Sequence, residues 1–181
     1  RLAIPGWASI EDALCGGFPL GSVTALYGAP GTGKTTLALQ LADAVTRLPL
    51  VRHHGSFNWL VRYDDVEVCV NALYVSTELS AALLKSFALR IELADSALGV
   101  LATTYVEEME RAIENTPPGF LVVDSLQELH VSETDVGHEI VEVTRRIVAL
   151  CRERSIAALV VLHANAEDDY AGPRTIEHLV D

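Results

Sequence analysis

A glycine-rich run of eight residues, from Gly28 to Thr35, matches the pattern G-x-x-x-x-G-K-[ST]. Glycines at these positions let a tight loop turn several backbone N–H groups toward one anion, because no Cβ atom interferes. The ammonium of Lys34 would neutralise the β- and γ-phosphates, and the hydroxyl of Thr35 is placed to ligate Mg²⁺. The run therefore predicts a loop that binds the phosphates of a nucleoside triphosphate.

The segments on both sides of this loop fit the same chemistry. Residues 22–27 have the apolar and β-branched character of a strand, and residues 35–42 have the pattern of a helix whose N-terminus would face the anion. The alternative is a glycine-rich turn that binds nothing. We favour the phosphate loop, because its mechanism requires a strand before it and a helix after it.

The rest of the chain alternates between strand and helix patterns. Strands are predicted at 22–27, 72–76, 98–102, 120–123 and 156–162, and helices near 35–47, 79–93, 105–115 and 138–154. This alternation predicts an α/β fold with a mostly parallel central sheet flanked by helices. The 181 residues suffice for one such domain, so we predict a single domain over 1–181.

Residues 48–71 do not follow the alternation of strand and helix patterns. We predict a β-hairpin insertion here, with arms at Asn58–Tyr63 and Val66–Val70 and a turn at Asp64-Asp65. The neighbouring pair His53-His54 lacks a third ligand at a suitable spacing, so we interpret it as part of an exposed loop and not as a metal site.

Three polar residues follow apolar runs, at the strand ends where ligands bind in open α/β sheets. Asp124 follows Phe120–Val123 in the manner of a Walker B carboxylate, which holds Mg²⁺ beside the Thr35 hydroxyl. Glu78 is suited either to placing the water that attacks the γ-phosphate or to stabilising the N-terminus of the next helix. His163 is suited either to sensing the γ-phosphate or to a buried structural role.

The charge of the chain argues against a general nucleic-acid surface. The net charge is −12, and the two lysines are Lys34 and Lys85, whereas phosphate contacts need clustered basic residues. One helix pattern carries four arginines, at 145, 146, 152 and 154. We interpret these as a solvated face paired with Glu142 and Glu153.

Cysteine usage and hydropathy indicate the compartment. Cys15, Cys69 and Cys151 are odd in number and far apart, so neither a disulfide framework nor a zinc ribbon is indicated, and we expect a reducing, cytoplasmic setting. No run approaches the roughly 18 apolar residues of a membrane span, so we expect no membrane partner. The chain begins at Arg1 without an initiator methionine and ends directly after a helix-like segment, so both a complete protein and a piece of a longer one are consistent with the sequence.

Several segments in order resemble the RecA-type ATPase core of the RadA (Sms) family of bacterial DNA-repair proteins. They are Pro19–Ser22, the phosphate loop, Tyr74–Glu78, Val122–Gln127 and Ala171–Asp181. The last segment, A-G-P-R-T-I-E-H-L-V-D, is the most diagnostic, because the clock ATPase KaiC and the helicase DnaB share the earlier motifs but not this one. The resemblance covers nearly the whole chain apart from 48–71.

The resemblance implies a RecA-like P-loop NTPase fold, ATP and Mg²⁺ as ligands, and a homo-oligomeric, hexameric ring on single-stranded DNA. The residues implied to bind the nucleotide are Gly28, Ala29, Pro30, Gly31, Thr32, Gly33, Lys34, Thr35 and Thr36. The residues implied in catalysis are Glu78, Lys34 and His163, with Thr35 and Asp124 toward Mg²⁺.

The chain also departs from the RadA pattern. The family's H-V-T-K stretch reads His163-Ala164-Asn165-Ala166 here, so the lysine that acts near a neighbouring nucleotide is missing. The two DNA-facing loops correspond to the acidic segments 132–139 and 166–170, which would repel phosphates. Arg90 matches one of two family arginines, and Phe87 replaces the other.

Three hypotheses about function therefore stand. The first is a Mg²⁺-dependent ATPase module of a RadA-like repair protein that acts on single-stranded DNA. The second is a KaiC-like regulatory or scaffold module that uses ATP as an assembly switch and does not bind DNA. The third is a truncated or engineered piece whose hydrolysis is vestigial.

Overall fold

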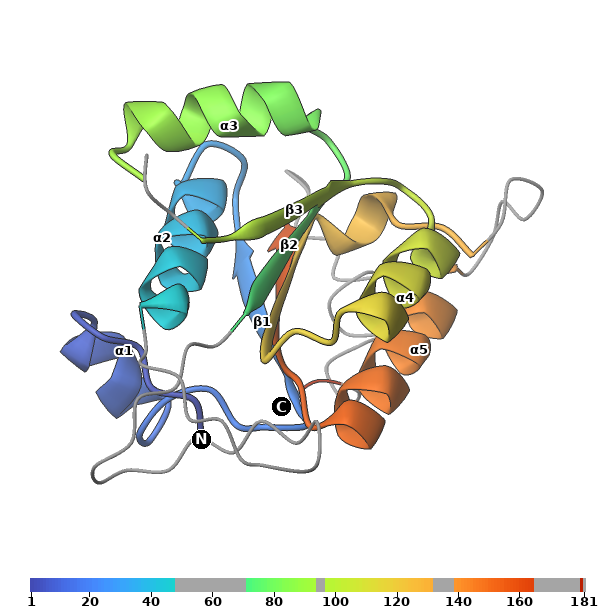
Figure 1. The fold of residues 1–181 in the computed structure, drawn as a ribbon, viewed down its shortest axis with the longest axis horizontal. Helices are drawn as coiled ribbons and strands as arrows, with labels where there is room; N and C mark the ends of the chain where they lie inside the picture. The colour runs from blue at the N-terminus through green and yellow to red at the C-terminus, as the bar shows by residue number, and fades with distance from the viewer. Residues whose placement is uncertain (48–70, 94–96, 132–138, 165–179, 181) are drawn as a thin grey trace.

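The computed structural model describes residues 1–47, 71–93, 97–131, 139–164 and 180. Within these residues, five strands form one sheet in the order β1-β5-β4-β2-β3 (Figure 1). The strands are β1 (Val23–Gly28), β2 (Ala72–Ser76), β3 (Gly99–Ala102), β4 (Phe120–Asp124) and β5 (Ala157–His163). Every pairing between them is parallel, which confirms the predicted parallel α/β fold.

Helices cover both faces of the sheet (Figure 1). On one side lie α2 (Lys34–Thr46) and α3 (Ala81–Arg90), and on the other lie α4 (Val106–Asn115) and α5 (Glu139–Arg154). The short helices α1 (Ala8–Ala13) and η1 (Leu126–Glu128) were not predicted from the sequence.

Local capping explains why α3 is shorter than the predicted helix over 79–93. The Ser80 hydroxyl accepts a hydrogen bond from the backbone N–H of Leu83, so the helix begins at Ala81. The helix ends at Arg90, and Glu92 then adopts a left-handed φ of 64°, a conformation that stops a helix.

The sheet separates two apolar clusters. On the α2 side, Val122 and Leu159 pack with Ala38 and Leu39 of α2. On the α4 and α5 side, Leu121 and Val160 pack among residues such as Met109 and Ile147. Strands β4 and β5 are buried along both faces except at His163, as their continuous apolar sequence predicted.

The strand register places the candidate functional residues at one edge of the sheet. Ser76 at the end of β2 pairs with Asp124 at the end of β4, and Gly28 at the end of β1 pairs with His163 at the end of β5. Because all five strands are parallel, these carboxyl ends meet at the same edge.

Two further expectations concern other parts of the chain. The predicted hairpin at 58–70 and the His53-His54 pair lie outside the described residues. In the described part of the chain, no helix is both long and apolar enough to cross a membrane.

Candidate functional site

The loop after β1 has the backbone that a phosphate loop needs. Gly31 and Gly33 have φ angles of 76° and 87°, in the left-handed region that residues with a Cβ rarely adopt. The Thr32 hydroxyl donates a hydrogen bond of 2.8 Å to the carbonyl of Ala29, which closes the turn. Gly33 is the N-cap of α2, so the helix begins at Lys34 and its N-terminal N–H groups adjoin the loop.

The ammonium of Lys34 lies within this loop. Its Nζ atom donates to the carbonyl oxygens of Gly28 and Ala29 at 2.8 and 2.9 Å, and the residue is only 7% exposed. A lysine ammonium has three N–H donors, so these two bonds leave one donor for an anion. The loop thus holds a buried positive charge beside a helix N-terminus, an arrangement suited to binding phosphate.

Asp124 ends β4 as a buried carboxylate. It is 7% exposed, and its Oδ2 atom accepts a hydrogen bond of 2.5 Å from the hydroxyl of Tyr74 on β2. Burial, together with the nearby Asp124 carboxylate, raises the pKa of Tyr74 far above its usual range. The phenol therefore stays protonated and acts as a donor to the carboxylate.

Glu78 and His163 are brought into contact. The Nε2 atom of His163 lies 3.1 Å from Oε1 of Glu78, and the hydroxyl of Ser125 donates to the same Glu78 oxygen at 3.1 Å. The Glu78 side chain is 50% exposed, so its carboxylate has access to solvent and to a ligand. A half-exposed carboxylate held by two neighbours is a suitable group for orienting a water molecule.

The connection after β4 is tied to the connection after β2. The Thr77 hydroxyl accepts from the backbone N–H of Ser125 at 2.8 Å and donates to the Ser125 carbonyl at 3.2 Å. The backbone N–H of Thr77 also donates to the Asp124 carbonyl at 2.9 Å. Glu78 and Asp124 are therefore linked through a few short hydrogen bonds.

Several residues that hold the site together were not predicted from the sequence. They are Tyr74, Thr77, Ser125 and Gln127, of which Gln127 donates to the His163 carbonyl at 3.1 Å. All four are polar residues within the segments Tyr74–Glu78 and Val122–Gln127, which marked the resemblance. Their place within these two segments was the only sign in the sequence that they belong to the site. Their hydrogen-bond partners could not be predicted, because these depend on the order of the strands in the sheet.

Not all of the predicted site residues touch one another. In the described part of the chain, no hydrogen bond or ion pair joins Lys34 to Glu78, Asp124 or His163. The predicted loop residues and the predicted strand-end residues thus form two groups at the same edge of the sheet.

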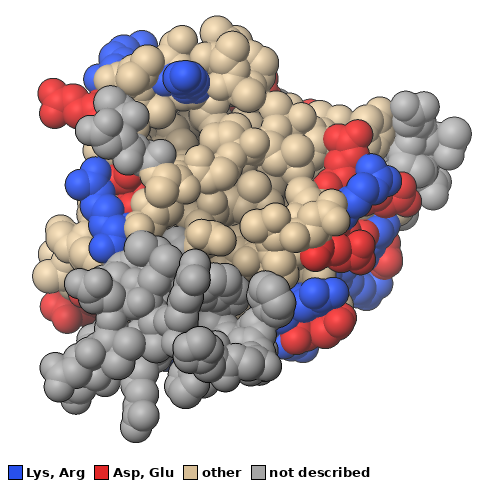
Figure 2. Space-filling view, viewed as in Figure 1, with Lys and Arg blue, Asp and Glu red and all other residues tan. Residues whose placement is uncertain are grey.

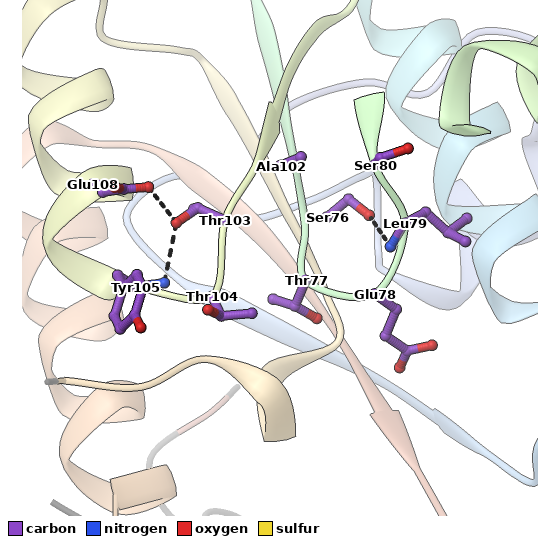
Figure 3. Close-up of a pocket in the computed structure, with 10 residues that line it drawn as sticks. All are labelled: Ser76, Thr77, Glu78, Leu79, Ser80, Ala102, Thr103, Thr104, Tyr105 and Glu108. Atoms are coloured by element: carbon purple, nitrogen blue, oxygen red, sulfur yellow. Dashed lines mark hydrogen bonds between the residues drawn. The ribbon is translucent and has the colours of Figure 1, made fainter. Parts of the chain in front are cut away.

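An open pocket of about 350 Å³ lies beside Glu78, between the connections that follow β2 and β3 (Figure 3). Its rim carries hydroxyls and two carboxylates, Glu78 and Glu108, and no lysine or arginine. Thr103 donates to Glu108 at 2.5 Å and accepts from the N–H of Tyr105 at 3.1 Å, so Glu108 helps to order the start of α4. The two carboxylates in this lining make the pocket unsuited to phosphate.

The arginines of α5 lie among carboxylates. Arg146 forms a two-point ion pair with Glu110 of α4, and Arg145 lies 3.9 Å from Glu142. Arg154 lies 3.6 Å from Glu153. Blue and red residues accordingly alternate on the right-hand face in Figure 2, over α4 and α5. The predicted paired, solvated face is confirmed for Arg145 and Arg154.

Arg90, which matches a family arginine, lies beside Phe87, which replaces the other one. The Arg90 guanidinium lies 4.7 Å from the centre of the Phe87 ring, at cation–π distance. The acidic segments 132–138 and 166–170, and residues 171–179 of the diagnostic tail, lie outside the described residues.

A phosphate loop after β1, a carboxylate at the end of β4 and an all-parallel sheet flanked by helices define a P-loop nucleotide-binding domain of RecA type. A family model described as an AAA domain matches residues 8–169. The chain belongs to this AAA domain family and is a RadA-like, RecA-type member of it.

Characterised relatives agree with this assignment. The DNA repair protein RadA of Aquifex aeolicus is 32% identical over 97% of this chain and 36% of its own length. The RadA proteins of Streptococcus pneumoniae and Bacillus subtilis are each 31% identical over 93% of this chain, which covers 36% and 33% of their lengths. The chain is thus a RecA-like ATPase domain related to RadA DNA repair proteins, and it spans about a third of their length.

Proposed function

We propose that this chain binds ATP with Mg²⁺ and hydrolyses it, as the motor module of a RadA-like DNA-repair protein that works as an oligomer on single-stranded DNA. One observation carries the hydrolysis proposal. The carboxylate of Glu78, held by His163 and Ser125, stands at the same sheet edge as the loop that contains Lys34.

Nucleotide binding rests on residues 28–36. The loop N–H groups and the start of α2 provide donors to the phosphates, and Lys34 provides the positive charge. When phosphate oxygens arrive, we expect the Lys34 ammonium to exchange its contacts with the carbonyls of Gly28 and Ala29 for contacts with the phosphates.

Thr35 and Asp124 are the residues that would hold Mg²⁺. Asp124 fits this role because it is buried, because one oxygen is engaged by a neutral donor, and because Mg²⁺ prefers oxygen ligands. The Thr35 side chain is half-buried in the first turn of α2. When bound, the ion neutralises charge on the β- and γ-phosphates.

Hydrolysis needs a group that orients the attacking water and accepts its proton. Oε2 of Glu78 has no hydrogen-bond partner among the described residues and is suited to accept a hydrogen bond from that water, while Oε1 remains held by Ser125 and His163. Lys34 stabilises the charge that develops on the phosphate oxygens. We expect slow turnover by this chain alone, because a cation supplied by a neighbouring subunit is worth on the order of 10³ in rate.

The DNA part of the proposal rests on the relatives, which are named DNA repair proteins. A second candidate is a nucleotide-switched assembly module that does not bind DNA. The net charge of −12 and the pairing of Arg145, Arg146 and Arg154 with carboxylates favour this second function.

The deciding experiment measures ATP binding and hydrolysis with and without single-stranded DNA at low salt. We expect Lys34→Ala to abolish nucleotide binding, and Glu78→Gln to lower kcat by about 10²-fold or more while binding persists. Lys85→Ala is the matched control, since Lys85 is an exposed lysine on α3.

Each outcome has a clear meaning. If Lys34→Ala and Glu78→Gln both leave the rate at the wild-type level, the assigned site is wrong. If hydrolysis occurs but DNA neither binds nor stimulates, the assembly-switch function replaces the DNA motor.

A further inference from the structure

The Tyr74 side chain lies on the same face of the sheet as the Asp124 carboxylate. Tyr74 pairs with Val122 and Ser76 pairs with Asp124 in the parallel register of β2 and β4. Because side chains two residues apart share a face, Tyr74 and Asp124 are neighbours on the α2 side, one pleat apart along the strands. The phenol spans that step and reaches Oδ2 of Asp124 at 2.5 Å.

The Tyr74 hydroxyl lies in an apolar environment, where packing of the ring does not require a polar group. Tyr74 is fully buried in the cluster formed with residues of α2, and its hydroxyl makes one hydrogen bond among the described residues, to Asp124. A phenylalanine would provide the same ring without a buried polar group. The hydroxyl therefore has one identifiable task, which is to bond the carboxylate.

The hydrogen bond from Tyr74 engages only one of the two carboxylate oxygens of Asp124. Oδ2 of Asp124 is engaged by Tyr74, and no side-chain hydrogen bond engages Oδ1 among the described residues. A charge-assisted O–H···O⁻ bond is short and directional, so it restrains rotation of the carboxylate. Oδ1 is then the oxygen that remains for a cation or for its bound water.

We propose that Tyr74 is a positioning residue for the metal side of the nucleotide site: its hydroxyl holds Oδ2 of Asp124 so that Oδ1 is presented to Mg²⁺ or to a Mg²⁺-bound water. The proposal rests on the proposed function, because it assumes that Asp124 serves Mg²⁺. Partners of this kind, which act through the ligand they hold, commonly change metal affinity by about 10-fold to 100-fold when removed.

The test measures binding of a fluorescent ATP analogue to the intact chain over a range of Mg²⁺ concentrations, and again in EDTA. We expect Tyr74→Phe to raise the half-saturating Mg²⁺ concentration by about tenfold. Binding in EDTA should match wild type, because the phosphate loop is untouched. Tyr27→Phe is the matched control, since it removes a phenol hydroxyl from a side chain that is 46% exposed, and we expect it to leave the Mg²⁺ dependence unchanged.

A second substitution distinguishes loss of carboxylate positioning from loss of folding as the cause of a changed Mg²⁺ dependence. Tyr74→4-aminophenylalanine keeps the ring and a weaker donor, so we expect a half-saturating Mg²⁺ concentration above wild type and below Tyr74→Phe. If Tyr74→Phe does not fold, Tyr74→4-methylphenylalanine, which fills the same space without a donor, takes its place, and a half-saturating Mg²⁺ concentration equal to wild type then overturns the role of Tyr74.

The remaining outcomes distinguish this inference from the proposed function. If folded Tyr74→Phe shows the same Mg²⁺ dependence as wild type, the role of Tyr74 is wrong and the proposed function stands. If wild type binds no nucleotide in the presence of Mg²⁺, both are overturned.

Discussion

The Nε2 atom of His163 lies 3.1 Å from Oε1 of Glu78, although the two residues are 85 positions apart in the chain. Glu78 follows β2 and His163 ends β5, and β4 lies between these strands in the sheet. The contact between His163 and Glu78 therefore spans the carboxyl end of β4. Ser125, which follows β4, donates a hydrogen bond to the same Glu78 oxygen. Two residues that the sequence presents as separate candidates form one hydrogen-bonded unit.

His163→Ala should lower the rate of ATP hydrolysis without weakening nucleotide binding. The substitution removes one of two groups that hold Glu78, and a hydrogen bond to a charged group contributes about 1.5–3 kcal/mol, or roughly tenfold or more in rate. Steady-state kinetics give kcat, and a fluorescent nucleotide gives the dissociation constant. An unchanged kcat would show that the contact with Glu78 has no role in hydrolysis.

Ser125→Ala should also lower kcat by roughly tenfold, because the Ser125 hydroxyl donates to the same Glu78 carboxylate oxygen. Ser125 is fully buried and donates to Glu78. Ser86→Ala is the matched control, since Ser86 is an exposed α3 residue whose hydroxyl bonds only its own helix. Equal rates for the two variants would contradict the assignment of Ser125.

Gly17→Ala should destabilise the fold more than Gly6→Ala. Both glycines have positive φ angles, of 104° and 83°, so alanine is strained at either position. A Cβ atom at Gly17 would also overlap the backbone carbonyl of Leu2, whereas at Gly6 nothing lies within 4 Å.

The difference in unfolding free energy between these two variants measures the cost of the overlap with Leu2, because the strain from positive φ is common to both. We expect Gly6→Ala to cost about 1–2 kcal/mol and Gly17→Ala to cost about 1–3 kcal/mol more, because the backbone must move. Chemical denaturation measures both. Equal losses would mean that the close approach to Leu2 relaxes without cost.

The Cys151 thiol should resist alkylation in the folded protein at pH 8. Burial raises the pKa of Cys151 to about 12, and the thiolate is the reactive form. Reactivity should therefore appear only as the pH rises toward that value. Since the folded state holds this proton more tightly than the unfolded state, the contribution of Cys151 to stability decreases as the pH rises above the ordinary thiol pKa, about 8.5.

Peptide mass spectrometry after a timed iodoacetamide treatment checks this prediction. The exposed Cys15 is the internal comparison. Labelling of native Cys151 as fast as Cys15 would contradict the burial argument, and denaturant should make the two residues equally reactive.

The strands with long apolar runs were predicted well, because a continuous apolar sequence directly indicates a strand that is buried on both faces. The continuous runs that became β4 and β5 are buried on both faces, and their limits moved by only one residue. The short helix α1 was missed because it has six residues and no buried side chain, so it has no apolar periodicity to detect. Residues 126–128 were missed for a similar reason, since a single turn of 3-10 helix depends on local geometry.

The sequence by itself determined the chemistry of this protein: a glycine-rich loop with Lys34 for phosphate, and the acidic groups Glu78 and Asp124 after apolar strands. These features are local, since residue type and spacing within one segment suffice to define them. Only the tertiary structure decided which groups meet, namely Tyr74 with Asp124, and Ser125 and His163 with Glu78. The physical reason is that strand order and register set these contacts, and both depend on how the helices pack across the two faces of the sheet.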